Sequence, residues 1–293
     1  MNLEGTFTAL ITPFRADGAL DLEALANLVE WQIESGVDGL VPCGSTGESA
    51  TLSHAEQSQV VKHVIEVSAG RVPVIAGSGS NSTREATDLT AEARRTGADA
   101  ALLISPYYNK PTQEGIFHHY RTVAEETGLP ILIYNIPGRT ASRIDPDTIA
   151  RLSRVEGVVG LKEAGGDLAA TSEAIRQSDP DFVVLSGDDA LTLPMLAIGG
   201  KGLITTTGNV APRQMAEITR AFMAGDSQGA RDAHERLLPL MNALFIETNP
   251  IPIKTALFLL GRIPDPVLRL PLTPMRKPNR DRLEAILTEI QPS

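Results

Sequence analysis

Lys162 is the residue whose type and place in the chain point most directly to chemistry. It stands near the end of the apolar run Val158–Glu163, which predicts a buried strand. An ammonium group there costs free energy unless it is paired or its pKa falls. Lowering the pKa by about two to three units would raise the fraction of free amine roughly a hundred- to a thousand-fold. Lys162 is thus a candidate nucleophile for a carbonyl carbon; the alternative is a solvated lysine, or one paired with Glu163.

Tyrosines gather near the predicted ends of strands. Tyr134 closes the run Ile131–Tyr134, and Tyr107 and Tyr108 follow another, although the chain has only four tyrosines. Forming an imine requires protons to move on and off a carbinolamine, so Tyr134 could relay protons beside Lys162. The alternative for Tyr134 is a core tyrosine whose hydroxyl bonds to the backbone.

The segment Gly44–Glu48, Gly-Ser-Thr-Gly-Glu, could face an anion with its backbone N–H groups. It lacks the lysine and the spacing of a nucleoside-triphosphate loop, and the alternative is a plain turn. Arg139 could clamp a substrate carboxylate, or lie on the surface. No metal site is predicted, because Asp188 and Asp189 have no histidine or further carboxylate nearby in the sequence.

These residues require a scaffold, and the chain repeats a short apolar run, a turn and a helical pattern about every thirty residues. Helix starts are marked by capping boxes at Ser53–Glu56 and Ser82–Glu85 and by an N-cap at Asp145. Helix ends are marked by glycines that can adopt a left-handed cap, namely Gly36, Gly97, Gly128 and Gly157. Alternation of strands and helices predicts a parallel sheet, and eight repeats predict an α/β fold of the (β/α)₈ TIM barrel class. The expected strands are Phe7–Ile11, Gly39–Cys43, Val74–Ala76, Ala100–Ile104, Ile131–Tyr134, Val158–Leu161, Phe182–Leu185 and Gly202–Thr205.

Active sites of such barrels lie at the carboxyl ends of the strands, where Lys162, Tyr134, Tyr108 and the Gly44–Glu48 loop are expected. Gly160 is expected to leave room for the lysine stem. We predict a barrel with the active site over residues 1–212, and a C-terminal helical extension over residues 213–293.

Composition narrows the class of protein. The chain has 293 residues, 42% hydrophobic and 21% charged, with a net charge of −10. The acidic balance argues against nucleic acid or an anionic membrane as a partner. Cys43 is the only cysteine, so an intrachain disulfide is excluded. The start of the chain lacks a signal-peptide pattern and no run has membrane-spanning length, which favours a cytoplasmic location.

Several segments together resemble the dihydrodipicolinate synthase and N-acetylneuraminate lyase superfamily of class I aldolases, and most resemble its synthase branch. They are Gly44–Leu52, Ser105–Gly115, Tyr134–Thr140, Gly160–Asp167, Leu185–Asp189 and Asn249–Lys254.

The resemblance implies a reaction in which Lys162 forms a Schiff base with pyruvate. The resulting enamine would add to L-aspartate 4-semialdehyde and give 4-hydroxy-tetrahydrodipicolinate, the committed step of lysine (diaminopimelate) biosynthesis. No cofactor or metal is implied. The resemblance also implies a homo-oligomer, commonly a dimer of dimers.

The resemblance assigns roles to individual residues. Tyr134 would shuttle protons with Ser45 and with Tyr108 from a neighbouring subunit. Thr46 and the backbone of Ile204 would contact pyruvate, and Arg139 would hold the carboxylate of the second substrate. Bacterial relatives inhibited by lysine bind it at positions that correspond to Ser49, Ala50, His54, Asn81, Glu85 and Tyr107; ordinary interface packing is the alternative for these.

Two other functions compete with the synthase. Ser45 replaces a threonine that is common in the synthases, and serine there is frequent among lyases. A pyruvate-dependent lyase acting on a sugar acid, of the N-acetylneuraminate or 2-keto-3-deoxygluconate type, would use the same Lys162 and Tyr134. A non-catalytic barrel that binds pyruvate or lysine is disfavoured, because Lys162 and all the expected relay hydroxyls are present.

Overall fold

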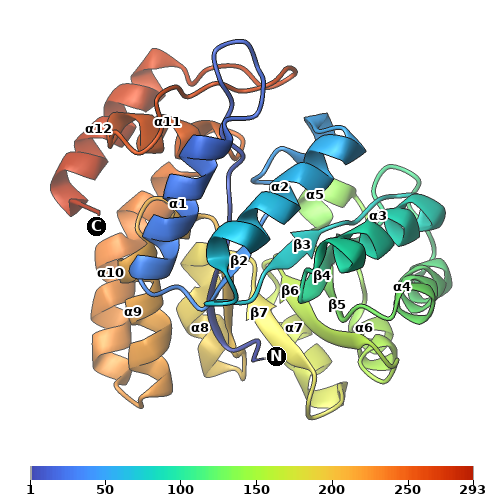
Figure 1. Ribbon diagram of the computed structural model, residues 1–293. Coiled ribbons are helices and arrows are strands. Elements are labelled where there is room, and N and C mark those ends of the chain that lie inside the picture. Colours follow the sequence, from blue (N-terminus) through green and yellow to red (C-terminus); the bar gives the residue numbers. More distant parts are fainter. Residues whose placement is uncertain (1, 293) are drawn as a thin grey trace. The chain divides into compact units, whose positions relative to one another are not determined.

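The computed structural model describes residues 2–292. Its eight strands follow the order β2-β1-β8-β7-β6-β5-β4-β3 in one sheet, and helices alternate with them along the chain (Figure 1). Strand β1 pairs with β2 in parallel, and the successive strands from β3 to β8 also pair in parallel. The predicted (β/α)₈ barrel class is confirmed, and helices follow its last strand.

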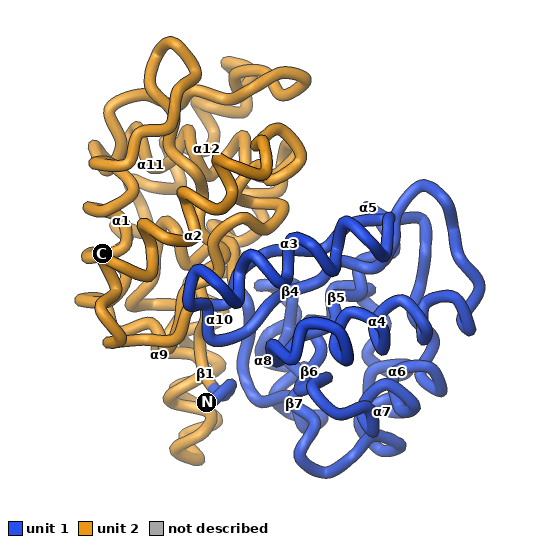
Figure 2. The backbone as a smooth tube through the Cα atoms, turned by 45° about the vertical axis from the view of Figure 1, so that its right-hand side comes forward, with its two compact units in different colours: residues 1–4, 75–204 blue, residues 5–74, 205–293 orange. Residues whose placement is uncertain are grey.

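The chain forms two compact units, coloured separately in Figure 2. The first unit comprises residues 1–4 and 75–204, and the second unit comprises residues 5–74 and 205–293. The boundary that we placed at residue 212 stays a prediction.

The first unit contains most of the sheet. Its strands pair in sequence order from β3 to β8, and they are largely buried because apolar side chains occupy both faces. The strands are β3 (Ile75–Gly77), β4 (Ala100–Ile104), β5 (Ile131–Asn135), β6 (Val158–Glu163), β7 (Val183–Ser186) and β8 (Gly202–Thr205). The helices are α3 (Thr83–Thr96), α4 (Gln113–Thr127), α5 (Pro137–Thr140), α6 (Pro146–Leu152), α7 (Leu168–Gln177), α8 (Thr192–Ala197) and the 3₁₀ turn η2 (Asp189–Leu191).

The second unit joins the start of the chain to its end. Strands β1 (Gly5–Ala9) and β2 (Gly39–Val41) pair in parallel. The helices α1 (Leu22–Glu34) and α2 (His54–Ser68) pack together, and the late helices form a second group. That group is α9 (Pro212–Met223), α10 (Ser227–Ala243), α11 (Ile251–Leu259) and α12 (Lys277–Ile290), with the 3₁₀ turns η1 (Ser49–Thr51) and η3 (Thr207–Asn209) elsewhere in the unit.

Helix boundaries show which local signals were sound. The capping box of α2 is formed in full by Ser53 and Glu56. The box predicted at the start of α3 is only half formed. The Ser82 side chain accepts from the backbone N–H of Glu85, but the Glu85 carboxylate accepts a hydrogen bond from the hydroxyl of Ser80 instead of from the N-cap backbone. Helix α6 begins after Asp145, but the Asp145 side chain makes no capping hydrogen bond, so that part of the prediction is wrong.

Of the four glycines that we expected to end helices in the left-handed conformation, three do so. Gly97 and Gly128 end α3 and α4. Gly36 directly follows the Ser35 cap of α1 with a φ of 84°; its N–H donates to the carbonyl of Ile33, and the N–H of Val37 donates to the carbonyl of Gln32. Gly157 also has positive φ, but it stands apart from α6, whose cap is Ser153.

Candidate active site

Lys162 and Tyr134 are neighbours in the first unit. They are paired in the register of β5 and β6, and paired residues of parallel strands direct their side chains to the same face. The Lys162 ammonium nitrogen lies 4.3 Å from the centre of the Tyr134 ring. Only 4% of Lys162 and 7% of Tyr134 are exposed. The sheet thus places a buried amine against a buried phenol, as we expected from the strand ends.

The stem of Lys162 fits into space left by a glycine that directly follows the neighbouring strand β7. A methyl group at Gly187 would lie 3.0 Å from both Cγ and Cε of Lys162. Gly160, which we expected to provide this room, lets two strands approach, since its methyl group would meet the Val183 carbonyl oxygen at 2.7 Å. The Lys162 stem therefore passes Gly187, and the room that we expected at Gly160 stays a prediction.

Burial makes Lys162 a weaker base than a solvated lysine. Desolvation lowers the pKa of Lys162 to about 8, with Asp189 opposing this shift and Arg139 adding to it. At pH 7 roughly one molecule in ten then carries the free amine. Burial raises the pKa of Tyr134 above its ordinary value; the charge of Arg139 opposes this rise, and the charges of Glu163 and Asp189 add to it. Tyr134 therefore keeps its proton at neutral pH and can donate it.

Glu163 is not the ion-pair partner that the alternative for Lys162 required. Alternation along β6 directs Glu163 to the opposite face from Lys162. There Oε2 of Glu163 accepts from Nδ2 of Asn135 at 2.8 Å, and Oε1 accepts from the backbone N–H of Gly165 at 2.5 Å. Burial raises the pKa of Glu163. The carboxylate is thus held on the outer face of the sheet.

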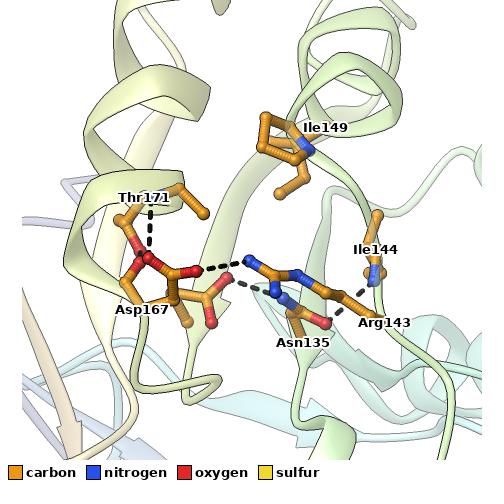
Figure 3. A pocket seen from close by; sticks show the side chains of 9 residues that line it. Asn135, Arg143, Ile144, Ile149, Asp167 and Thr171 are labelled. Atoms are coloured by element: carbon orange, nitrogen blue, oxygen red, sulfur yellow. Dashed lines mark hydrogen bonds and ion pairs between the residues drawn. The ribbon is translucent and has the colours of Figure 1, made fainter.

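Asn135 joins three parts of the first unit. Besides its bond to Glu163, its Oδ1 accepts from the backbone N–H of Ile144 at 3.0 Å. Figure 3 shows the contact between Asn135 and Ile144 beside a small pocket, which Glu163 also lines, with Arg143 pointing towards Asp167. The Arg143 and Asp167 side chains lie 3.1 Å apart. Asn135 therefore ties the ends of β5 and β6 to the segment that follows α5, the helix that carries Arg139.

The other predicted residues of the first unit differ in exposure. Ile204 is fully buried in β8 and Arg139 is exposed on α5. Tyr108 is 88% exposed and Tyr107 is 38% exposed, on the segment between β4 and α4. Tyr108 also has a φ of 72°, which a residue with a Cβ rarely adopts. The first unit thus brings together Lys162, Tyr134 and the charge of Arg139, while Tyr108 projects into solvent.

Ser45 and Thr46 lie in the second unit, on the loop that follows β2. The loop turns through a hydrogen bond from the N–H of Gly47 to the carbonyl of Gly44, at 3.0 Å. The hydroxyl of Thr12 donates to the carbonyl of Gly47 at 2.7 Å. Thr46 is 2% exposed and its Oγ1 accepts from Nδ2 of Asn249 at 2.9 Å. The gathering of Ser45 and Thr46 with Lys162 stays a prediction.

The six positions predicted to bind lysine divide between the two units. Ser49, Ala50 and His54 surround the start of α2 in the second unit, where Ala50 and His54 are exposed. Asn81, Glu85 and Tyr107 belong to the first unit, and the carbonyl of Asn81 accepts from Asn109 at 2.8 Å.

Sequence reasoning missed residues that act through others. Asp189, which we considered as a partner for a hydroxyl or a metal, is 2% exposed and its charge raises the pKa of Lys162. Asn135 and Gly187 stand at the ends of predicted strands, but we assigned them no role. Asn249 and Lys254 received none either, because nothing in the sequence relates them to a loop some two hundred residues earlier.

Two findings concern the whole of the described chain. Among residues 2–292, no group of three or more His, Cys, Asp or Glu side chains is arranged so that it could hold a metal ion. Within the same range, no helix combines the length and the apolar character needed to cross a membrane.

Comparison with known proteins decides the family. The family described as "Dihydrodipicolinate synthetase family" matches residues 2–290 of this chain. The chain belongs to this family. A similar relative, the 4-hydroxy-tetrahydrodipicolinate synthase of Nitratidesulfovibrio vulgaris (strain DP4), is 54% identical over 288 residues, which are 98% of each chain.

Solved structures of dihydrodipicolinate synthases agree with this membership. The enzyme from Aquifex aeolicus matches with a TM-score of 0.96 and 47% identity, over 99% of this chain and 98% of that one. A chloride-inhibited enzyme from Acinetobacter baumannii, solved with pyruvate, matches with a TM-score of 0.97 and 43% identity over all of both chains. The enzyme from Cyanidioschyzon merolae, solved with lysine bound, matches with a TM-score of 0.95 and 38% identity over 98% of each chain.

Proposed function

We propose that this chain condenses pyruvate with L-aspartate 4-semialdehyde to give 4-hydroxy-tetrahydrodipicolinate and water. The observation that carries the proposal is the buried pair of Lys162 and Tyr134, 4.3 Å apart and at the ends of adjacent strands, in a chain that belongs to the dihydrodipicolinate synthetase family. The product is an intermediate on the route to diaminopimelate and lysine, so the enzyme is a lyase of amino-acid biosynthesis.

The first half of the reaction uses the free amine of Lys162. Its nitrogen attacks the ketone carbon of pyruvate, and the carbinolamine loses water to give an imine. Loss of a proton from the methyl carbon then gives an enamine. Tyr134 is a neutral phenol at working pH, since its pKa lies above that of an ordinary tyrosine, which is itself near 10. Its hydroxyl can therefore pass a proton to the departing hydroxyl and receive one back.

The second half forms one carbon–carbon bond. The enamine carbon attacks the aldehyde of the semialdehyde, and the hydroxyl formed there is retained. The amino group of the same substrate then attacks the imine carbon and displaces the nitrogen of Lys162, which closes the ring and regenerates the amine. Arg139 holds the carboxylate of the semialdehyde, because a guanidinium can bind both carboxylate oxygens.

We assign the remaining site residues as follows. Thr46 and the backbone of Ile204 bind pyruvate, and Ser45 takes part with Tyr134 in moving protons. Tyr108 completes the relay from a second copy of the chain in a dimer of dimers, and its 88% exposure supports a role outside its own protomer. Sedimentation of the intact protein tests the assembly. A monomer with full activity would contradict it.

Substrate trapping and substrate choice test the proposal. Borohydride reduction with pyruvate should add one pyruvate-derived group to the peptide that contains Lys162, and Lys162→Met should abolish the adduct. If another peptide carries the adduct, or none does, the Schiff-base assignment fails. Activity is then compared for condensation with aspartate semialdehyde and for cleavage of N-acetylneuraminate or 2-keto-3-deoxygluconate. Activity with sugar acids alone would replace the synthase by a lyase.

We further propose that L-lysine inhibits the enzyme at Ser49, Ala50, His54, Asn81, Glu85 and Tyr107. Glu85 offers a carboxylate to an ammonium group, and Tyr107 is partly exposed. Lysine should lower activity in a saturable way, and Glu85→Gln should weaken inhibition at least ten-fold, because a charge-assisted hydrogen bond contributes about 1.5–3 kcal/mol. Unchanged activity in millimolar lysine would refute this assignment.

A further inference from the structure

The segment Asn249–Lys254 makes two buried contacts with the loop Gly44–Glu48 of the same unit. Nδ2 of Asn249 donates to Oγ1 of Thr46 at 2.9 Å. The Lys254 ammonium lies 2.5 Å from Oε1 of Glu48, and each of these side chains is only 1% exposed. A fully buried ion pair is a weak source of stability, since desolvation of two charges offsets their attraction. The pair therefore calls for a reason other than holding the fold.

Glu48 shows what the ion pair holds in place. Its φ is 55°, in the left-handed region that costs a residue with a Cβ about 1–2 kcal/mol. Both of its carboxylate oxygens have partners, because Oε2 accepts from the backbone N–H of Arg269 at 3.1 Å. Fixing the side chain at both oxygens fixes the strained backbone to which it is attached, at the end of the loop.

Lys254 is held as firmly as its partner. Its ammonium also donates to the carbonyl of Val267 at 2.8 Å and lies 4.1 Å from the centre of the Phe14 ring. Carbonyl oxygen, carboxylate and ring face all favour a charged ammonium. Lys254 therefore acts as a fixed point for Glu48 and not as a mobile surface lysine.

The bond from Asn249 to Thr46 has a direction, and that direction is informative. The nitrogen of an amide side chain can only donate, so Oγ1 of Thr46 must accept in this contact. The single hydrogen of the Thr46 hydroxyl is then directed to a different acceptor. A carboxylate has only acceptor atoms, so Asn249 sets Thr46 to serve as a donor to one.

We propose that Asn249 and Lys254 are positioning residues for the pyruvate-binding loop: Asn249 orients the Thr46 hydroxyl as a donor to the pyruvate carboxylate, and Lys254 holds the loop backbone through Glu48. The identity of pyruvate rests on the function proposed above. The C-terminal part of the chain thereby acts on substrate binding without contacting substrate.

The decisive variant is Asn249→Asp, which keeps the shape of the side chain but replaces the donor by an acceptor. Thr46 would then donate to Asp and no longer to substrate. We expect the KM for pyruvate to rise at least ten-fold, as the loss of a hydrogen bond to a charged group predicts. The KM for the semialdehyde and kcat should change less than about three-fold. Asn242→Asp, an exposed change on α10, is the matched control and should leave all three values unchanged.

A double-mutant cycle separates this role from a structural one. If Asn249 acts only through the Thr46 hydroxyl, Asn249→Asp should have no further effect on pyruvate binding in a Thr46→Val background. An equal rise in KM in both backgrounds would overturn the assignment of Asn249. An unchanged KM in the single variant, or equal effects on both substrates and kcat, would overturn it as well. Asn249→Ala repeats the cycle if the Asp variant does not fold.

Lys254 is tested through its partner. Lys254→Met leaves a buried carboxylate unpaired and should lower Tm, whereas Lys254→Met combined with Glu48→Gln should restore Tm. If the ion pair positions the loop, the KM for pyruvate stays raised in the double variant although its Tm has recovered. Recovery of both Tm and KM would show that the pair has a purely structural role. Lys277→Met, at a side chain 83% exposed, is the control.

The pyruvate concentration that half-saturates borohydride trapping provides a readout independent of the aldehyde. If the wild-type protein forms no adduct, the proposed function fails. If it forms the adduct but Asn249→Asp leaves the half-saturating concentration unchanged, only the positioning role fails.

Discussion

The pH dependence of Schiff-base formation should report the environment of Lys162 directly. Desolvation lowers its pKa to about 8, Asp189 opposes that shift, and Arg139 adds to it. Replacing each charge by a neutral side chain should therefore move the pKa in opposite directions. Asp189→Asn should move the midpoint below that of the wild type, and Arg139→Leu should move it above.

The size of the pH effect on trapping follows from the pKa shift of Lys162. A fall from 10.5 to about 8 corresponds to about 3 kcal/mol at 1.36 kcal/mol per unit. At pH 7 the free amine is then present in roughly one molecule in ten, against about one in 3,000 for an unshifted lysine. Trapping of pyruvate should accordingly rise about ten-fold between pH 7 and pH 9 and level off, where a solvated lysine would continue to rise towards pH 10.5.

The assay is the initial rate of borohydride-trapped adduct, measured by mass with pyruvate alone, so that a role of Arg139 in binding the second substrate does not enter. Asp188→Asn is the matched control, because Asp188 caps the turn η2 and is not among the groups that shift the pKa of Lys162. A wild-type midpoint near 10.5 would refute the reasoning. So would a shift of both charge variants in the same direction.

Three further predictions follow from single side chains. Lys162→Met should raise the free energy of unfolding at pH 7 by up to about 3 kcal/mol, because it removes the cost of burying the ammonium. Calorimetry should show this gain fading between pH 8 and pH 10.5, where the lysine of the unfolded chain still holds a proton that the folded chain has lost. A gain independent of pH would contradict this prediction. Gly187→Ala places a methyl group 3.0 Å from the Lys162 stem, so we expect trapping to slow at least ten-fold with a loss of about 1–3 kcal/mol in stability; an unchanged trapping rate would show that the stem has room. Arg269 lowers the pKa of Glu56 from 4.5 to about 2, so this pair stabilises the fold above pH 4.5 and the contribution is lost as pH falls through 2. Glu56→Gln should flatten acid unfolding between those values, and an unaltered acid limb would exclude the pair as its cause.

The sheet and the lysine–tyrosine pair were predictable because both depend on local patterns. Short apolar runs separated by capped helices specify a parallel sheet, and alternation along a strand determines which side chains share a face. Lys162 and Tyr134 each end such a run, so their proximity required only that β5 and β6 be neighbours. The same rule assigned Glu163 to the other face, although we had kept it as a possible partner of Lys162.

Predictions failed where a side chain had a choice of partners. The carboxylate of Glu85 accepts a hydrogen bond from the hydroxyl of Ser80 instead of completing a capping box. Asp145 precedes a helix, but its side chain does not cap it. A capping pattern states which bonds are possible within four residues, but competing donors decide which of them forms. The room beside the Lys162 stem likewise depends on a residue distant in the sequence, because Gly187 lies after β7 whereas Lys162 lies on β6.

The sequence by itself determined the class of fold, the nucleophilic chemistry expected of Lys162 and the loops that carry hydroxyl groups, since these depend on periodicity and on residue type. Only the tertiary structure decided how strongly Lys162 is desolvated, which charges act on it, and that Asn249 and Lys254 hold Thr46 and Glu48. The physical reason is distance along the chain. Asn249 and Thr46 are 203 positions apart, and no local pattern encodes which buried donor will meet which buried acceptor.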